Sequence, residues 1–157
     1  YWVPFSLGQM SMHDFWYQTF LENGRKLSDA EINHVNSLVL DSHYPYPEVM
    51  GWVRKLRPAY KTALATNTAK DWFEYWDKKF SLSQSFDVII IPSKVGVRKP
   101  DKRFFETTAK ELELQPKEVL YIDDQERMVK GALEAGMRAE LFKPDLNNLV
   151  EVLVNAR

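Results

Sequence analysis

Four short apolar runs, each followed by a segment with helical spacing, constrain the fold of residues 60–157 more than any other feature of the chain. The runs are TALAT at 62–66, DVIII at 87–91, EVLYI at 118–122 and RAELF at 138–142. Strands that alternate with helices are joined by right-handed crossovers and form a parallel sheet with helices on both faces. The pattern therefore predicts an α/β fold with a Rossmann-like parallel sheet and flanking helices.

Apolar residues three or four positions apart indicate a helix after each run. In chain order they are Trp72, Phe73, Trp76 and Phe80; Phe104, Phe105, Ala109 and Leu112; Met128, Val129, Ala132 and Ala135; and Leu146, Leu149, Val150 and Leu153. Each run and its helix therefore make one strand–helix unit.

Residues 1–57 show helical patterns only. Ser28 and Glu31 form a capping box at the start of one helix. The apolar stripe behind that box consists of Ile32, Val35, Leu38 and Val39. Pro47 suits the first position of another helix. We therefore divide the chain into a helical part, residues 1–57, and an α/β part, residues 58–157.

Charge and composition argue against several kinds of partner. The net charge is −1, so no electrostatic attraction to nucleic acid or to an anionic membrane is expected. No apolar stretch approaches the roughly 20 residues that span a membrane. Cysteine is absent, which excludes disulfides and thiolate metal sites. We expect a cytoplasmic protein that binds neither nucleic acid nor membranes.

Five polar residues fall at the expected carboxyl ends of the strands or between them. Thr66 and Asn67 follow the first run, and Asp123 and Asp124 follow the third. Lys99 lies in the KVGVRKP segment between the second run and the third. Because ligands of open parallel sheets bind at the carboxyl edge, we expect these side chains to converge on one rim.

Each of these residues also has an ordinary structural interpretation. Thr66 and Asn67 suit a helix N-cap, and Lys99 suits a solvated loop. Asp123 and Asp124 suit the positive end of a helix, but one aspartate is enough for that. A second carboxylate at the end of a buried strand costs desolvation and repulsion unless a cation lies nearby. The combination therefore favours a functional site.

The chemistry of these groups suits phosphoryl transfer. Adjacent carboxylates bind a hard cation such as Mg²⁺. The cation and a lysine neutralise phosphoryl oxygens, while a hydroxyl and helix N-terminal amides donate hydrogen bonds to them. A further, correctly placed carboxylate would form an aspartyl-phosphate.

Three segments resemble the second, third and fourth motifs of the haloacid dehalogenase (HAD) superfamily. They are ALATN at 63–67, VGVRKPDKRFF at 95–105 and VLYIDDQERMVKGALEAGMRAELF at 119–142. Residues 1–57 are similar to the later part of the helical cap that one branch carries after its first motif. The resemblance implies a HAD-like core with a partial helical cap.

The resemblance also implies a role for each residue of the rim. Thr66 would bind the transferring phosphoryl group, with Asn67 beside it. Lys99 would stabilise the phosphoryl oxygens and the charge of the nucleophile. Asp124 would be a direct Mg²⁺ ligand, and Asp123 would act through water or through the lysine. The implied substrate is a small phosphate monoester.

The first motif of the family, Asp-x-Asp, has no counterpart in the sequence. We therefore expect a chain that begins inside the cap and lacks the nucleophile and the general acid/base. It would also lack the central first strand, which lies between the strands at 62–66 and 118–122. The facing edges of those strands would close up, accept another segment, or take a strand from a second copy in a homodimer. Met128, where relatives often carry a polar residue, is a second departure, which indicates either a weakened metal site or simply variation within the family.

Three functions remain compatible with these residues. The first is a Mg²⁺-dependent phosphatase, of which this chain by itself would be inactive. The second is a degenerate, non-catalytic interaction module. The third is a haloacid-type hydrolase, which the aspartate pair disfavours because the dehalogenases of the superfamily need no metal and lack that pair.

Overall fold

The computed structural model describes residues 1–142 and confirms the α/β fold of the second part of the chain. All four predicted strands are present, each within two residues of its predicted ends. They are β1 (Ala63–Ala65), β2 (Val88–Ile90), β3 (Leu120–Asp123) and β4 (Arg138–Leu141). The helix expected around residues 146–153 lies outside the described residues.

The strands form two separate parallel pairs. β1 pairs with β2 in the register Ala63 to Val88, and β3 pairs with β4 in the register Leu120 to Arg138. Within residues 1–142 no ladder joins β1 to β3. In the described part of the chain, the two strands expected to flank the first strand have therefore not closed up on each other.

The helices of the α/β part follow the strands as the spacing predicts. The long ones are α5 (Lys70–Phe80), α8 (Lys102–Glu111) and α9 (Glu126–Glu134). Shorter turns not predicted from the sequence are α6 (Leu82–Ser85), α7 (Pro92–Val95) and the 3₁₀ turn η1 (Pro116–Glu118). Asp101 caps the N-terminus of α8, and its side chain accepts a hydrogen bond from the Arg103 amide at 2.9 Å.

The helical part consists of α1 (Trp2–Ser6), α2 (Met12–Glu22), α3 (Asp29–Ser42) and α4 (Pro47–Leu56). The predicted capping box is confirmed, because the Ser28 side chain bonds the Glu31 amide while the Glu31 carboxylate bonds the Ser28 amide. One residue of the predicted stripe is wrong: Leu38 is 57% exposed, and Leu40 is buried instead. The stripe shifts because the last turns of α3 pack against α5, where the Trp76 indole donates to the Leu40 carbonyl.

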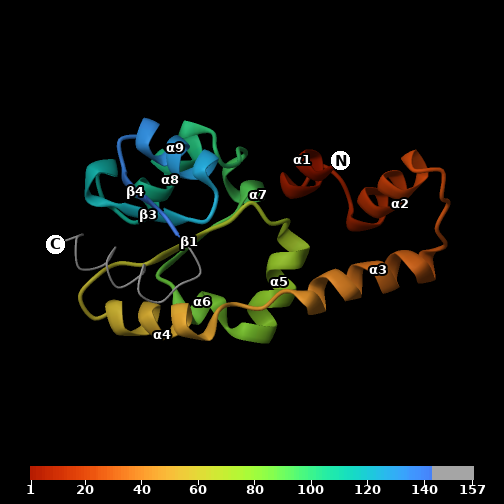
Figure 1. The fold of residues 1–157 in the computed structure, drawn as a ribbon, viewed down its shortest axis with the longest axis horizontal. Helices are drawn as coiled ribbons and strands as arrows, with labels where there is room; N and C mark the ends of the chain where they lie inside the picture. Colours follow the sequence, from red (N-terminus) through yellow and green to blue (C-terminus); the bar gives the residue numbers. More distant parts are fainter. Residues whose placement is uncertain (143–157) are drawn as a thin grey trace.

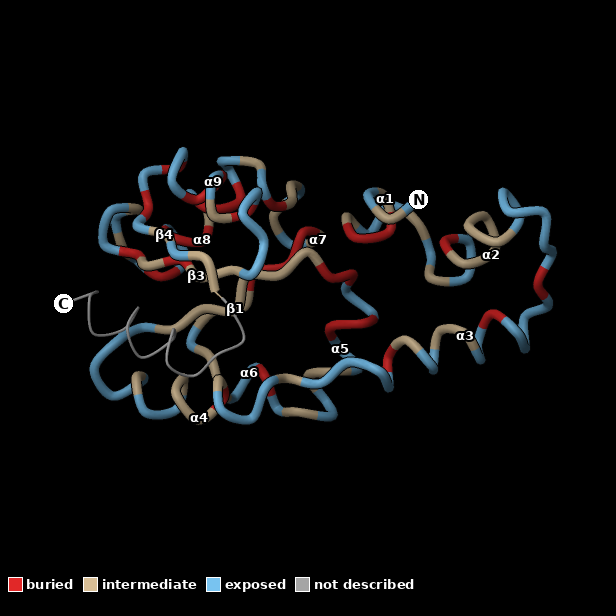
Figure 2. The backbone as a smooth tube through the Cα atoms, in the orientation of Figure 1, coloured by how far each residue is buried: buried red, intermediate tan, exposed pale blue. Residues whose placement is uncertain are grey.

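Three hydrophobic clusters hold these elements together. One lies around α8, α9, β3 and β4, and it includes Phe105, Tyr121 and Met128. A second is aromatic and joins Phe5 and Phe15 of the helical part to α5. The third joins α4 to α5, α6 and the end of β2. The buried positions gather around α8 and α9 and along α5, which therefore connects the two parts (Figure 2).

In space, α2 lies at one end of the molecule, α1 lies between α2 and α7, and α9 with the β3–β4 pair lies toward the other end (Figure 1). No helix in the described part is both long and apolar enough to cross a membrane. The division of the chain after residue 57 remains a proposal.

A close approach between α9 and the loop before α8 shapes the rim of the α/β part. A Cβ atom added at Gly131 would lie 2.7 Å from the Pro100 carbonyl oxygen and 2.9 Å from Cε2 of Phe105. Only glycine allows this approach, because the Pro100 oxygen belongs to the backbone and Phe105 is fully buried, so neither neighbour can move aside cheaply. The contact fixes α9 against the segment that carries Lys99.

We expect Gly131→Ala to lower the free energy of unfolding by about 1–3 kcal/mol, the usual effect of overpacking. Gly51→Ala on α4 is the matched control, because its added Cβ would meet only the tip of Arg54 at 3.9 Å. That control gains helix propensity and should be stabilised by up to about 1 kcal/mol. Urea unfolding followed by circular dichroism measures both, and equal effects of the two substitutions would contradict the packing argument.

Candidate functional site

A buried lysine is the centre of the rim at the carboxyl end of β3. Lys99 Nζ lies 2.7 Å from Asp123 Oδ2 and donates a hydrogen bond to the Tyr121 hydroxyl at 2.7 Å. The Tyr121 hydroxyl in turn donates to Asp123 Oδ2. The side chains of Lys99 and Asp123 are only 9% and 10% exposed. The three groups therefore form one closed, nearly dry network.

Mutual contact sets the charge states of this network. Burial alone would raise the pKa of Asp123, but the charge of Lys99 and hydrogen bonds from Lys99, Tyr121 and the Gln125 amide outweigh it and lower that pKa. Burial first, and then the hydrogen bond to Asp123, raise the pKa of Tyr121 far above its ordinary value. Tyr121 is therefore a neutral donor and Asp123 an anion at neutral pH.

Asn67 holds the Lys99 segment in place from the other side. The Asn67 side-chain amide donates to the Lys99 carbonyl at 2.9 Å, and its oxygen accepts from the Lys99 backbone amide at 2.8 Å. Asn67, just after β1, therefore holds the backbone of Lys99 by two hydrogen bonds, and the Lys99 side chain contacts Asp123. Two turns that are 32 residues apart in sequence are joined by the single Asn67 side chain.

Thr66 and Asp124, the other two predicted site residues, differ in their surroundings. The Thr66 amide continues the ladder with Ile90, at 3.0 Å, and its hydroxyl accepts from the Thr68 amide at 3.3 Å. Asp124 is exposed, and its carboxylate makes no hydrogen bond or ion pair with residues 1–142. The structure thus links Asn67, Lys99 and Asp123 by direct contacts and leaves the Asp124 carboxylate open. The roles of these residues in a reaction remain predictions.

The donor set at this rim fits a hard cation only in part. The carboxylate of Asp124 is open, whereas Asp123 Oδ2 is taken by Lys99 and Tyr121 and Asp123 Oδ1 by the Gln125 amide at 3.0 Å. In the described residues no group of three or more histidine, aspartate or glutamate side chains converges. Mg²⁺ commonly uses one or two carboxylates together with water and phosphate oxygens, so these residues supply part of such a shell.

Sequence reasoning missed the part played by Tyr121. The signal was present, because Tyr121 and Asp123 are two positions apart on a strand and so point to the same face. Met128, the second departure from the family pattern, is buried. Its side chain is 3% exposed and packs in the cluster around α8 and α9, which gives it a packing role.

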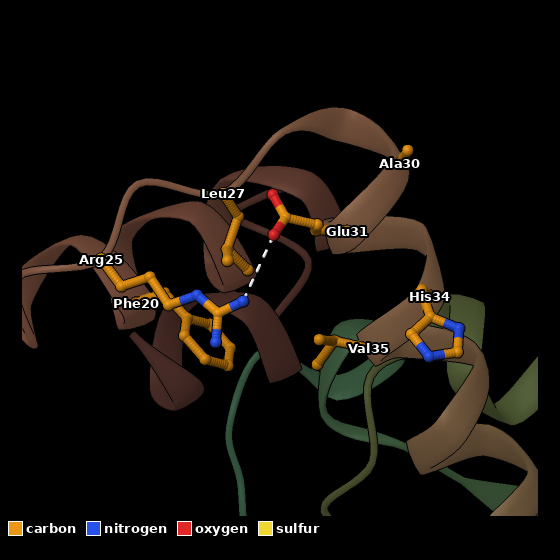
Figure 3. A pocket seen from close by; sticks show the side chains of 7 residues that line it. All are labelled: Phe20, Arg25, Leu27, Ala30, Glu31, His34 and Val35. Atoms are coloured by element: carbon orange, nitrogen blue, oxygen red, sulfur yellow. Dashed lines mark hydrogen bonds and ion pairs between the residues drawn. The ribbon is translucent and has the colours of Figure 1, made fainter.

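A separate hollow lies between α2 and α3 (Figure 3). These two helices belong to the helical part, and Figure 1 shows α2 far from β3. Its walls are mostly apolar, with Arg25 and Glu31 bonded to each other at 3.2 Å across one side. His34 lines the same hollow, and His13 pairs with Asp29 at 3.1 Å. His13 and His34 therefore take part in the packing and polar contacts of the helical part, and neither lies among the groups bonded to Lys99.

Comparison with known families decides which family this fold represents. The family model described as haloacid dehalogenase-like hydrolase matches residues 11–136, most of the chain. The chain belongs to this family. The match runs from α2 through α9, so it includes most of the helical part as well as the rim of the HAD-like hydrolase.

Curated relatives of this HAD-like hydrolase are similar over part of their length. Glyceraldehyde 3-phosphate phosphatase of Methanopyrus kandleri is 29% identical over 97 residues, which are 59% of this chain and 41% of that enzyme. Bifunctional epoxide hydrolase 2 of Mus musculus is 29% identical over 98 residues, 58% of this chain and 17% of that protein. The chain thus matches less than half of the length of these relatives.

Solved structures show the same fold. A HAD family enzyme of Bacteroides thetaiotaomicron, crystallised with magnesium and inorganic phosphate, superposes with a TM-score of 0.78 at 20% identity, over 94% of this chain and 79% of that one. L-2-haloacid dehalogenase of Xanthobacter autotrophicus superposes with a TM-score of 0.71 at 21% identity, over 98% and 64%. At such identities the likeness establishes the fold alone.

We expect Lys99→Met to lower the free energy of unfolding by about 3 kcal/mol, because Asp123 would keep a buried charge without its cation. The double variant Lys99→Met/Asp123→Leu should lose less than the sum of the single losses. Lys70→Met is the control, since the Lys70–Glu74 pair is exposed and should give no resolvable loss. Additive losses in chemical denaturation would show that Lys99 and Asp123 do not depend on each other.

The lowered pKa of Asp123 predicts a loss of stability in acid. A carboxyl group with a lowered folded pKa contributes stability above its unfolded pKa of about 3.9, and that contribution is lost as the pH falls through the folded value. The stability difference between the wild type and Asp123→Asn should therefore be constant from pH 7 to about 5 and shrink below about pH 4. Thermal unfolding across this range measures it, and a constant difference down to pH 2.5 would refute the assignment.

Proposed function

We propose that this HAD-like hydrolase carries the phosphate-binding and metal-binding side of a phosphoryl-transfer site for a small phosphate monoester. The observation that carries the proposal is Lys99, held 2.7 Å from Asp123 at the same rim as the open carboxylate of Asp124. A lysine fixed in a dry network keeps its charge in place for developing phosphoryl oxygens and needs no reorganisation. The Thr66 hydroxyl would donate to the same group.

Asp124 would hold Mg²⁺ directly, and Asp123 would orient the lysine beside it. When bound, the cation would neutralise phosphoryl oxygens. The structure supports different roles for the two aspartates, because Asp123 already accepts from Lys99, Tyr121 and the Gln125 amide, whereas Asp124 is open.

The described residues, 1–142, offer no candidate for the nucleophile of such a reaction. The sequence contains no Asp-x-Asp, and Asp87, beside the strand β2, lies before the strand and not after it. Asp87 is also engaged: it accepts from Arg57 at 2.7 Å and from the Thr62 amide at 2.7 Å. We therefore propose that this chain by itself does not complete the reaction.

The remainder of the substrate would lie in the hollow between the α1–α2 turn and the start of α5. This hollow is lined by polar and apolar groups, among them Phe5, Gln9, Ser11 and Lys70. Lys70, which lines this hollow, is four residues after Thr66, so the chain between them spans at most about 14 Å. A small, partly polar organic group suits this lining.

The relatives support this choice. The phosphatase of Methanopyrus kandleri is named for a small phosphorylated substrate, and the Bacteroides thetaiotaomicron enzyme was crystallised with magnesium and phosphate. The haloacid dehalogenase has the same fold, but the pair Asp123–Asp124 favours a metal-assisted phosphoryl reaction.

We expect that the purified chain does not hydrolyse p-nitrophenyl phosphate in about 5–10 mM Mg²⁺. It should bind Mg²⁺ with a dissociation constant on the order of millimolar, and Asp124→Asn should lose that binding. Glu48→Gln in the exposed first turn of α4 is the control, because it lies outside the proposed site, and it should bind Mg²⁺ as the wild type does. Mn²⁺ relaxation and a phosphate-release assay give the two readouts. Turnover that Asp124→Asn abolishes would refute the inactivity, and equal metal binding in both variants would refute the metal site.

A further inference from the structure

Two arginines stand beside this rim without an acidic partner. Arg98 directly precedes Lys99 and is half-buried, and Arg127 lies exposed in the first turn of α9. Neither guanidinium group makes an ion pair or hydrogen bond within residues 1–142, whereas those of Arg25, Arg57 and Arg103 each pair with a carboxylate. Two arginines at one edge of the site are thus left with free donors.

The packing of α9 places these two arginines next to each other. Gly131 of α9 lies so close to Pro100 that a Cβ added to the glycine would be only 2.7 Å from the Pro100 carbonyl oxygen. Arg127 is four residues before Gly131 and so occupies the same face of α9, one turn closer to the rim. Arg98 is two residues before Pro100. Both arginines therefore flank the same contact between α9 and the loop.

Electrostatics agrees with this placement. Burial, and then the positive charge of Arg127, lower the pKa of the Arg98 guanidinium, and no carboxylate offsets them. Two like charges at one spot oppose folding unless something compensates them. Nearby Asp101 does not, because it is bonded to Arg103 at 2.6 Å and caps α8.

We propose that Arg98 and Arg127 together form a binding site for an oxyanion, a phosphate or a carboxylate group, distinct from the groups around Lys99. Guanidinium groups bind such anions with two parallel hydrogen bonds each and are weakly hydrated, which suits a half-buried position. A bound anion removes the repulsion between the two arginines and fills donors that the described chain leaves open. The site lies at the start of α9, where the helix dipole also favours negative charge.

The first experiment titrates the full chain with sodium sulfate at constant ionic strength, without Mg²⁺, and follows the arginine Nε–Hε resonances by NMR. The Arg98 and Arg127 signals should shift together and saturate with one dissociation constant. In Arg98→Gln, saturation of the Arg127 shift should require at least about tenfold more sulfate than in the wild type. Saturation of the Arg98 shift should require a similar increase in Arg127→Gln, because sulfate is no longer bound by two guanidinium groups together.

Arg54→Gln is the matched control, because Arg54 is an exposed arginine of α4 that also forms no ion pair within the described residues. The substitution should leave the sulfate affinity of Arg98 and Arg127 within about twofold of the wild-type value, since Arg54 lies outside the pair. Shifts of Arg98 and Arg127 that do not saturate, or that match those of Arg54, would overturn the proposal. Circular dichroism of each variant verifies that the fold is intact.

A second experiment, which rests on the proposed function, identifies the source of the anion. Glycerol 3-phosphate carries one anionic group, and 3-phosphoglycerate carries a carboxylate as well. If the arginines bind a second group of the substrate, the wild type should prefer 3-phosphoglycerate by about tenfold, and Arg98→Gln/Arg127→Gln should lose that preference. Equal affinities alongside saturable sulfate shifts would support a site for a free anion. Failure of both organic ligands to bind would count against the proposed function alone, because the sulfate titration tests the arginines independently.

Discussion

The buried ion pair between Lys99 and Asp123 is the interaction on which the arrangement of the rim depends. Two charged side chains with 10% exposure or less would be costly to bury apart, and the pair is tolerated because its remaining donors and acceptors are satisfied by Tyr121 and the Gln125 amide. The Asn67 side chain adds two hydrogen bonds to the backbone of Lys99. Segments from three parts of the chain are therefore held at one edge.

The same rim shows how the fold positions charge. The contact of Gly131 with Pro100 brings α9 against the Lys99 segment, and this brings the first turn of α9 and Arg127 beside Arg98. Positive charge is neutralised within the Lys99 network but not at the arginines. The region thus combines one satisfied cation, one open carboxylate at Asp124 and one uncompensated cationic pair, an arrangement suited to an anionic ligand and a metal ion.

Local patterns predicted the elements well, and tertiary packing explains the exceptions. The strands around 62–66 and 118–122 and the capping box at Ser28 were confirmed because their signals are local: apolar runs, turn residues and cap chemistry. Leu38 was assigned to the wrong face because helical periodicity alone does not specify which neighbour a long helix meets in its last turns. The hydrogen bonds between Asn67 and Lys99 were missed because no local rule joins residues 32 apart.

The sequence by itself determined the order of strands and helices, the parallel connections and the residue types available at the carboxyl rim, since these follow from periodicity and from the chirality of crossovers. It also determined that no Asp-x-Asp is available. Only the tertiary structure decided which carboxylate is engaged and which is open, that Tyr121 belongs to the Lys99 network, and that Arg98 lies near enough to Arg127 to feel its charge. The physical reason is that hydrogen bonds and charge pairing between distant segments depend on how α8 and α9 pack against the strands. No single stretch of the sequence determines that packing.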